Sequence, residues 1–457
     1  MLLLFFIILA ISCFVAFTSH KYALTAVLLI GFIQDPFRKV VAGEPIIFIV
    51  TVGIVFGVLM LKTVNRVGFS RLSDPFVNWV DYVYKPLALF LVLLTIQFFH
   101  SFIRWGNIVV SLIGMLSYLA PFLAIVVGYY SVNSLDDVRK FMKIYVGFGL
   151  LVSVTVALSF SGFELSIFRE IGVGLKIYDQ GTVLRSFSGI MRTGEIASWH
   201  LATTACFLMI LYATSESKPP IALFIIAVFF LLLVISFTGR RKMVMLVSLF
   251  GVCYLFGFFY LRKTLSVTSV IMGFSATFLL WFAVEFMFPS GYGTDVQNYL
   301  SRGSSVYSGA SSRFLELGLN PIKWAYNRVG LFGGGLGIAS QGAQLFQVTS
   351  IAGGSGEGGL GKVMVELGLP GLVVIIWLAV AVARYIFGCL KLASQRFVQP
   401  QLMILILGAA VFLMVNLMTF SVATQVYGDI FVLLMLGLVS GFVFALPKFV
   451  AQNIHQA

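Results

Sequence analysis

Long unbroken apolar runs recur along this chain and constrain its fold more than any other feature. The runs 221–238, 265–288 and 360–382 reach or approach the ~20 residues that cross the hydrocarbon core of a membrane. Backbone groups in that core must be hydrogen-bonded within the protein, and continuous apolar runs achieve this as helices, since a barrel strand needs alternating residues. The chain is 60% hydrophobic and 10% charged, against ~25% charged residues in soluble domains. We therefore predict an all-α integral membrane protein.

Polar breaks between the runs predict a polytopic bundle of about 12–13 transmembrane helices. The expected spans lie near residues 2–17, 22–34, 45–61, 86–103, 107–131, 141–160, 195–214, 219–238, 243–261, 265–288, 361–388, 401–420 and 427–447. The expected domains are N-terminal helices at 1–160, an extracytoplasmic loop at 161–193, central helices at 194–288, a large extracytoplasmic loop at 289–359, and C-terminal helices with a cytoplasmic tail at 360–457.

The net charge of +13 bears on orientation. If residues 289–359 face outward, the connections 62–85, 136–143, 262–263 and 384–396 are cytoplasmic, and each carries Lys or Arg. Short cytoplasmic loops of membrane proteins are enriched in these residues. The pattern predicts a multi-pass protein of the cytoplasmic (inner) membrane, with membrane lipid as a contact and its active loop outside.

The same orientation leaves many basic residues outside, where the enrichment of Lys and Arg in cytoplasmic loops does not explain them. One interpretation is a set of solvated loop charges. The other is a binding site for an anion, because the planar guanidinium fork binds phosphate in a bidentate manner and stays charged. At a membrane surface, the ligand expected from this chemistry is a lipid-linked phosphate or pyrophosphate. The residues are Arg169, Lys176, Arg185, Arg192, Arg240, Arg241, Lys242, Arg302, Arg313, Lys323 and Arg328.

Several functions are disfavoured. The four cysteines lack the spacing of a zinc site, and Asp295 is an isolated carboxylate, so we expect no metal and no cofactor. The run Gly333–Gly337 lacks the Lys-Ser or Lys-Thr ending of a phosphate-binding loop, which disfavours nucleotide use, and no nucleic-acid partner is expected. His200, inside an apolar run, is expected to be a satisfied interior histidine.

Two segments near the central spans carry a family resemblance. Residues 185–195 read Arg-Ser-Phe-Ser-Gly-Ile-Met-Arg-Thr-Gly-Glu, an Arg- and Gly-containing stretch that leads into a span. Residues 237–242 read Phe-Thr-Gly-Arg-Arg-Lys, which is similar to a Thr-Gly-Ser-Arg turn with Arg241 in the place of the arginine.

Two further segments lie in and after the large loop. Arg313, Trp324 and the glycine turn 331–337 follow one another in that order. Residues 357–371 contain Glu-Leu-Gly-Leu-Pro-Gly after an apolar stretch. Together the four segments resemble the bacterial O-antigen ligase and O-antigen polymerase superfamily over roughly residues 180–447. These membrane glycosyltransferases use undecaprenyl-pyrophosphate-linked sugars. Family members typically carry a histidine nine residues before the Glu, and this chain has Glu357 there.

The resemblance implies a GT-C-like fold and a glycosyl transfer in which a sugar hydroxyl attacks an anomeric carbon and polyprenyl pyrophosphate leaves. Arg241 and Arg313 are the candidates for stabilising the leaving group without a metal. Glu357 is the candidate base, although a solvated loop residue or a charge at a helix N-terminus would have the same sequence. The candidate substrate-binding residues are Arg185, Arg192, Arg240, Trp324 and Arg328.

Polymerisation of lipid-linked repeat units into an envelope polysaccharide or exopolysaccharide is favoured over ligation to a lipid or other acceptor. Two more functions stay open: flipping or transport of the lipid-linked sugar, and a structural role beside polysaccharide assembly and chain-length proteins.

Three carboxylates in or near the spans have separate expected roles. Glu366 is expected to be a packing or positioning residue, and Glu195 a structural partner at a helix start. Glu285 lies inside an apolar run, where a charge is costly, and is expected to be functional.

Overall fold

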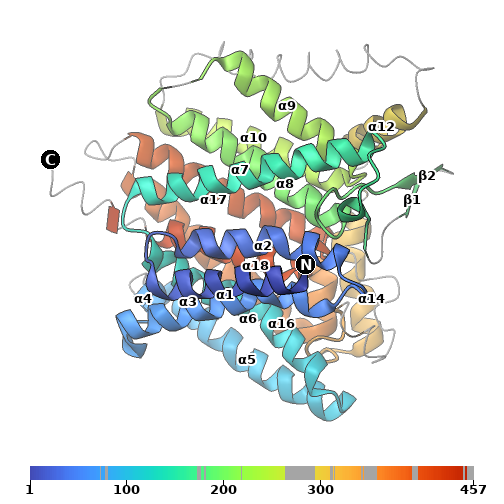
Figure 1. Cartoon of the computed structure of the whole chain (residues 1–457). Helices are drawn as coiled ribbons and strands as arrows, with labels where there is room; N and C mark the ends of the chain where they lie inside the picture. Colours follow the sequence, from blue (N-terminus) through green and yellow to red (C-terminus); the bar gives the residue numbers. More distant parts are fainter. Residues whose placement is uncertain are drawn as a thin grey trace. The chain divides into compact units, whose positions relative to one another are not determined.

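The computed structural model describes most of the chain as helix (Figure 1). Its described residues are 1–72, 74–77, 81–171, 176–179, 182–217, 219–262, 294–308, 312, 314–340, 343, 358–393, 400–445 and 448–449. The main helices are α1 Leu2–Thr18, α2 Ala23–Val40, α3 Thr51–Val67, α5 Asp81–Trp105, α6 Ile108–Ser131, α7 Leu135–Phe160, α8 Gly194–Thr214, α9 Ile221–Phe237, α10 Arg241–Arg262, α12 Thr294–Ser308, α14 Asn320–Val329, α16 Gly359–Ala393, α17 Pro400–Val422 and α18 Ile430–Phe444.

Shorter elements connect these helices. A two-stranded antiparallel sheet pairs β1 (Lys176–Asp179) with β2 (Thr182–Arg185). The short helical segments are Ile46–Val50, Phe69–Arg71, α4 Asp74–Val77, Ser166–Phe168, Phe314–Leu319 and Val426–Gly428.

Eight helices of the described part are long and apolar enough to cross a membrane. They are Ile46–Val67, Val83–Trp105, Ile108–Ser131, Leu135–Phe160, Gly194–Thr214, Arg241–Phe258, Gly359–Lys391 and Pro400–Val422. The shorter apolar helices α1, α9 and α18 match further expected spans. The prediction of a multi-pass helical membrane protein is thus confirmed.

The expected span 265–288 lies outside the described residues. Two other expectations about boundaries are modified. Within the expected loop 289–359, the described residues form α12, a π-helical turn and α14. The helix α2 continues to Val40, beyond the expected end at residue 34. Its last turns carry charged side chains that the hydropathy pattern excluded from a span.

The chain forms two compact units, each built from segments that are distant in sequence. Unit 1 comprises Met1–Val58, Ser134–Ser308 and Arg396–Val415. Unit 2 comprises Leu59–Asn133, Gly309–Gln395 and Asn416–Ala457. The compact units therefore do not coincide with the consecutive segments that were expected as domains from the sequence.

In unit 1, α7 and α8 pack closely. Trp199, Tyr145 and Phe207 are fully buried there. His200 is also fully buried, and its Nδ1 lies 2.6 Å from the Tyr145 hydroxyl. This agrees with the expected interior histidine.

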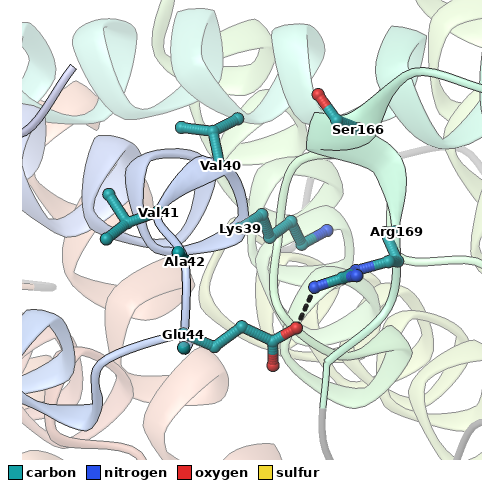
Figure 2. Close-up of a pocket in the computed structure, with 8 residues that line it drawn as sticks. Lys39, Val40, Val41, Ala42, Glu44, Ser166 and Arg169 are labelled. Atoms are coloured by element: carbon teal, nitrogen blue, oxygen red, sulfur yellow. Dashed lines mark hydrogen bonds and ion pairs between the residues drawn. The ribbon is translucent and has the colours of Figure 1, made fainter.

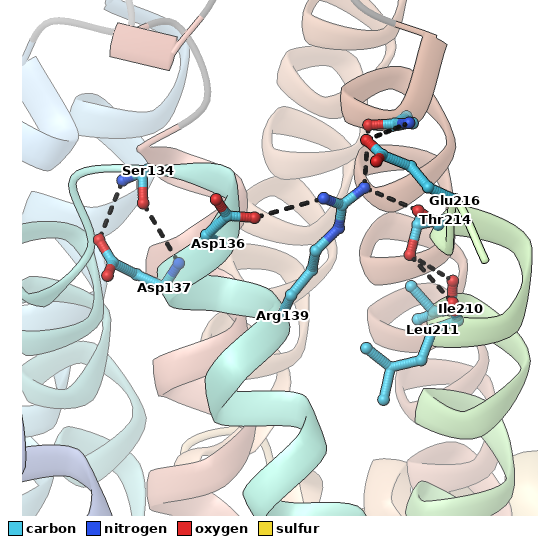
Figure 3. A network of polar contacts seen from close by, with 9 residues as sticks. Ser134, Asp136, Asp137, Arg139, Ile210, Leu211, Thr214 and Glu216 are labelled. Atoms are coloured by element: carbon cyan, nitrogen blue, oxygen red, sulfur yellow. Dashed lines mark hydrogen bonds and ion pairs between the residues drawn. The ribbon is translucent and has the colours of Figure 1, made fainter.

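A polar network closes one end of the α7–α8 pair in unit 1 (Figure 3). The Arg139 guanidinium donates to the carbonyl of Thr214 at the end of α8 (2.7 Å) and to the side-chain oxygen of Gln401 (3.1 Å). It also pairs with Asp136 at 3.3 Å. A cation that bonds the last carbonyls of a helix satisfies acceptors that the helix itself leaves open. Arg139 thereby ties α8 and α17 to the start of α7.

In unit 2, α6 and α18 pack through glycines. A Cβ on Gly128, Gly437 or Gly441 would lie 2.3–2.5 Å from a backbone oxygen of the other helix. Small residues let helices in a membrane approach closely and gain dispersion contacts.

The glycine turn 333–337 is buried in unit 2 against α5, α6 and α16. The Trp105 indole N–H donates to the carbonyl of Gly334 (2.8 Å), and the Ser101 hydroxyl donates to that of Leu336 (2.7 Å). The N–H of Gly334 donates to the carbonyl of Val365 at 2.7 Å. A Cβ on Gly337 would lie 2.0 Å from the carbonyl oxygen of Val110. The glycines therefore serve close backbone packing.

Gly337→Ala should destabilise the protein strongly. Gly337 has φ +83, which costs a residue with a Cβ about 1–2 kcal/mol, and the clash with Val110 adds to this. Gly330→Ala is the matched control, because its φ is +82 and no atom lies within 4 Å of the added Cβ. Thermal unfolding in detergent should give a larger loss for Gly337→Ala, whereas equal losses would contradict the packing argument.

Candidate functional site

Five arginines lie at one end of unit 1, where α7 ends, α8 begins, α9 ends and α10 begins. We call them the arginine cluster: Arg185, Arg192, Arg240, Arg241 and Arg302. The first four are predicted site residues, and Arg302 belongs to the basic loop residues of the sequence.

A hydrophobic cluster in unit 1 supports the arginines. Ile177 and Leu184 of the β1–β2 hairpin pack with Phe237 of α9 and Tyr299 of α12. The rings of Phe160 and Phe237 stack at 3.9 Å, which joins the ends of α7 and α9. The apolar faces of the hairpin and of α12 thus position the polar residues beside them.

Hydrogen bonds fix the loop backbones of the same end. The Ser186 hydroxyl donates to the carbonyl of Thr238 (3.0 Å), and Arg302 Nε donates to that of Gly239 (3.0 Å). The Tyr299 hydroxyl donates to the carbonyl of Arg185. Arg185 itself lies in β2, and these bonds connect β2, the turn between α9 and α10, and α12.

Arg241 begins α10, and its Nη1 donates to the Ser305 hydroxyl of α12 at 2.8 Å. The contact orients the guanidinium through a neutral oxygen. Arg302 Nε donates to a carbonyl in the same way. Both contacts therefore fix the position of a guanidinium group.

Carboxylates pair with the other members of the cluster. Arg192 binds Asp35 of α2 through Nη1 (3.4 Å) and through its backbone N–H (3.0 Å). Arg240 Nη1 lies 2.8 Å from Glu195 Oε1. A carboxylate in the first turn of a helix is also stabilised by the helix dipole, so Glu195 serves both α8 and Arg240.

Arg185 pairs with Glu170 at 3.1 Å, and the exposure of the two side chains differs sharply. The Arg185 side chain is 56% exposed, whereas that of Glu170 is 6% exposed. The guanidinium also lies 5.4 Å from the Phe187 ring centroid. Glu170 therefore orients Arg185 while more than half of the Arg185 side chain stays exposed to solvent.

Lys39, in the last turn of α2, adds a buried amine to this end. Its Nζ donates to the carbonyl of Gly189 (2.7 Å) and to the Ser188 hydroxyl (3.3 Å). Burial lowers the pKa of Lys39 to about 7, opposed by the charges of Asp35 and Glu170. Arg169 lowers the pKa further. The folded protein thus holds an amine that titrates near neutral pH.

The remaining described candidates lie in unit 2. Trp324 on α14 packs beside Ala325, Ile338 and Val365, and Arg328 of the same helix is exposed. The structure therefore gives Trp324 a packing role and leaves Arg328 at the surface.

Glu366 is fully buried inside α16 of unit 2. It accepts hydrogen bonds from the Tyr118 hydroxyl (2.8 Å) and from the backbone N–H of Ala339 (3.2 Å). One carboxylate oxygen thus holds Ala339 after the glycine turn, and the other holds Tyr118 of α6. This agrees with the expected positioning residue.

Glu357, Arg313 and Glu285 lie outside the described residues. Within the described ranges, no group of three His, Cys, Asp or Glu side chains is placed to hold a metal ion.

Sequence reasoning missed two carboxylates and a buried amine at this end of unit 1. Asp35, Glu170 and Lys39 were not among its candidates, although they contact or adjoin the cluster. The sequence did contain a signal for these charged residues of α2, since the apolar run that starts at residue 22 is interrupted by Asp35 and followed by Arg38-Lys39. Charges at the end of a span need partners, but only the tertiary structure identifies Arg192 as the partner.

No protein-family model matches this chain, and no curated protein matches it. The fold defines the class as a multi-pass helical membrane protein. A narrower function must be argued from the arginine cluster and its surroundings.

The stability of the protein should depend on Lys39 and on pH. An unfolded lysine keeps its proton up to about pH 10, whereas the folded protein releases it near 7. The folded state therefore binds fewer protons between these values, so that stability rises with pH in this window. In thermal unfolding, Lys39→Met should be more stable than the wild type at pH 6, and the difference should shrink towards pH 10. Lys176→Met, at an exposed strand position, is the control and should give a difference independent of pH.

Proposed function

We propose that this protein is a metal-independent membrane glycosyltransferase that polymerises lipid-linked saccharide units into an envelope polysaccharide. The donor would be an oligosaccharide on undecaprenyl pyrophosphate, and the arginine cluster would face the outer side of the cytoplasmic membrane. The resemblance of residues 180–447 to the O-antigen ligase and polymerase superfamily supports the reaction class.

One observation carries the proposal: five arginines from three separate segments meet at one end of unit 1 and are oriented by neighbouring side chains and backbone. In this reaction the bond between the anomeric carbon and the phosphate oxygen breaks, and negative charge develops on the pyrophosphate. Preorganised guanidinium groups stabilise such charge without having to reorganise during the reaction. Arg185, Arg240 and Arg241 are the proposed contacts of the pyrophosphate.

The attacking hydroxyl must also lose its proton. Glu357 remains the proposed acceptor, because it occupies the position of the family's histidine and is followed by glycines that leave room for a saccharide. Arg313 remains the proposed second contact of the leaving group.

Polymerisation is preferred to ligation because Glu357 replaces the histidine and because no segment of the sequence is dedicated to a lipid A core acceptor. Chain-length and assembly proteins would be the expected partners. The proposed substrate reaches the site by lateral diffusion, since its polyprenyl chain stays in the bilayer.

Transport of the lipid-linked sugar is a second candidate, favoured by unit 2. Its helix α16 is interrupted at Gly368, where φ is 69 and ψ is −169. Lys362 and Glu366 are buried in the preceding part of α16, and both contact Tyr118. Interrupted helices and ionisable residues inside spans are features of transporters. Translocation of the lipid-linked sugar across vesicles without chain growth would support this candidate.

Arg241→Gln should reduce polymer formation by about 10²-fold, the effect of removing one donor from a transition-state anion. The assay incubates purified protein in liposomes with an undecaprenyl-pyrophosphate oligosaccharide, without nucleotide or metal, and resolves the lipid-linked products by size. Arg241→Lys should recover activity only in part, since an ammonium lacks the fork. Lys176→Gln removes an exposed cation from β1 and should remain active. Equal losses of polymer formation in the Arg241 and Lys176 variants would contradict a specific role of Arg241 and indicate a general effect of positive charge.

Glu357→Gln should abolish chain growth while leaving binding of the lipid-linked donor intact, because the amide cannot accept the hydroxyl proton. Glu357→His is expected to retain part of the activity, since histidine is the residue found in the family. The same product assay, combined with donor binding, checks both. Unchanged turnover in Glu357→Gln would show that another group accepts the proton of the attacking hydroxyl.

A further inference from the structure

A cavity of about 570 Å³ opens in unit 1 beside the end of α2 (Figure 2). It is lined by residues 40–43 and by Lys39, Glu44, Ser166 and Arg169. The volume falls in the range of about 300–1,000 Å³ that is typical of small-molecule sites. None of the residues assigned above to the pyrophosphate lines this cavity.

The polar walls of the cavity are held in place. The Arg169 guanidinium bonds the Glu44 carboxylate, as the dashed line in Figure 2 shows. Arg38 Nε donates to the carbonyl of Glu44 at 3.1 Å. Glu44 has φ +47, a left-handed conformation that is strained for a residue with a Cβ. Such strain persists where the surroundings over-determine the conformation, which is frequent at binding sites.

Lys39 is 4% exposed, and its amine donates to the carbonyl of Gly189 beside the cavity. Its pKa of about 7 means that the amine is only partly charged at neutral pH. Arg169 and Glu44 neutralise each other. The lining therefore combines cationic donors with an anionic acceptor and carries little net charge.

The Arg169–Glu44 pair leaves the lining with hydrogen-bond donors and an acceptor and without a large excess of either charge. A neutral ligand with several hydroxyls matches such a lining, since each hydroxyl both donates and accepts a hydrogen bond. Hydrogen bonds to charged partners are stronger than those between neutral groups. The Ser166 hydroxyl in the lining adds another adaptable partner.

We propose that the cavity formed by Lys39, Glu44, Ser166 and Arg169 is a saccharide subsite, which takes neutral sugar residues of the glycan. The choice of ligand rests on the proposed function. The subsite would hold a sugar near the same end of unit 1 as the arginine cluster, because Lys39 bonds Gly189 and Arg192 bonds Asp35 one turn earlier on α2. In this proposal the sugar and the pyrophosphate of the same substrate are bound by different sets of residues.

Cysteine labelling tests the subsite without turnover. Ser166→Cys is made in the full-length protein with Cys13 and Cys253 replaced by alanine; Cys206 and Cys389 are buried and are kept. Maleimide labelling is followed in detergent with neutral mono- and disaccharides, with glucuronate, and with inorganic pyrophosphate. Ser161→Cys, at an exposed position outside the cavity lining, is the matched control.

A neutral saccharide should slow labelling of Ser166→Cys about tenfold at roughly ten times its Kd, and should not slow labelling of Ser161→Cys. Adding Arg169→Gln should weaken saccharide affinity about tenfold, as expected for one lost charged hydrogen bond, and should therefore reduce protection at the same concentration to about twofold. The Arg169 side chain is 62% exposed, so this variant is expected to fold. Protection that Arg169→Gln leaves unchanged would overturn the proposal.

Protection by pyrophosphate or glucuronate alone would make the cavity an anion site and overturn the proposal, as would the absence of protection by any compound. The labelling result is separable from the product assay. If a saccharide protects Ser166→Cys from labelling but the protein forms no polymer, the subsite is supported and the proposed glycosyltransferase function is contradicted. If the protein forms polymer but no saccharide protects Ser166→Cys, only the subsite is contradicted.

Discussion

The rest of this structure depends on the cost of leaving a backbone N–H or C=O unpaired in apolar surroundings. Each unsatisfied group costs several kcal/mol in hydrocarbon, so apolar runs form helices. Inside these helices the backbone N–H and C=O groups bond one another and leave no group free to bind a ligand. Polar chemistry is thereby displaced to helix ends and to the segments that join them. At one end of unit 1, Arg139 bonds the carbonyl of Thr214, the last residue of α8, and the other end carries the arginine cluster.

The arginine cluster shows how positive charge is held at such an end. Asp35 is 2% exposed and Glu170 is 6% exposed, whereas the Arg185 that Glu170 pairs with is 56% exposed. A buried carboxylate without its cation would be costly, so these pairs oppose movement of the loop. Arg241 and Arg302 bond neutral oxygens of α12 and of the turn between α9 and α10. The carboxylates act as anchors that fix the orientation of the guanidinium groups.

Unit 2 changes the interpretation of the glycine-rich motif. The sequence order of Arg313, Trp324 and the glycine turn suggested a loop that meets a substrate. In the structure, the turn 333–337 is buried, Trp105 and Ser101 bond its carbonyls, and Trp324 packs beside it. Glu366 accepts the N–H of Ala339 next to the same turn. A motif of small residues is equally compatible with ligand approach and with close backbone packing, because both require the absence of a Cβ.

The sequence by itself determined the membrane class, most of the helices and the basic character of the loops, since hydropathy over ~20 residues and charge are properties of contiguous segments. It also placed His200 and Glu366 correctly as interior residues. Only the tertiary structure decided that Asp35 pairs with Arg192, that α12 binds Arg241 through Ser305, and that Lys39 and Arg169 share a cavity. Those partners are separated by 157, 64 and 130 positions, and no periodicity in a sequence encodes which distant side chains meet. Contacts of this kind depend on how helices pack, which is a property of the whole unit.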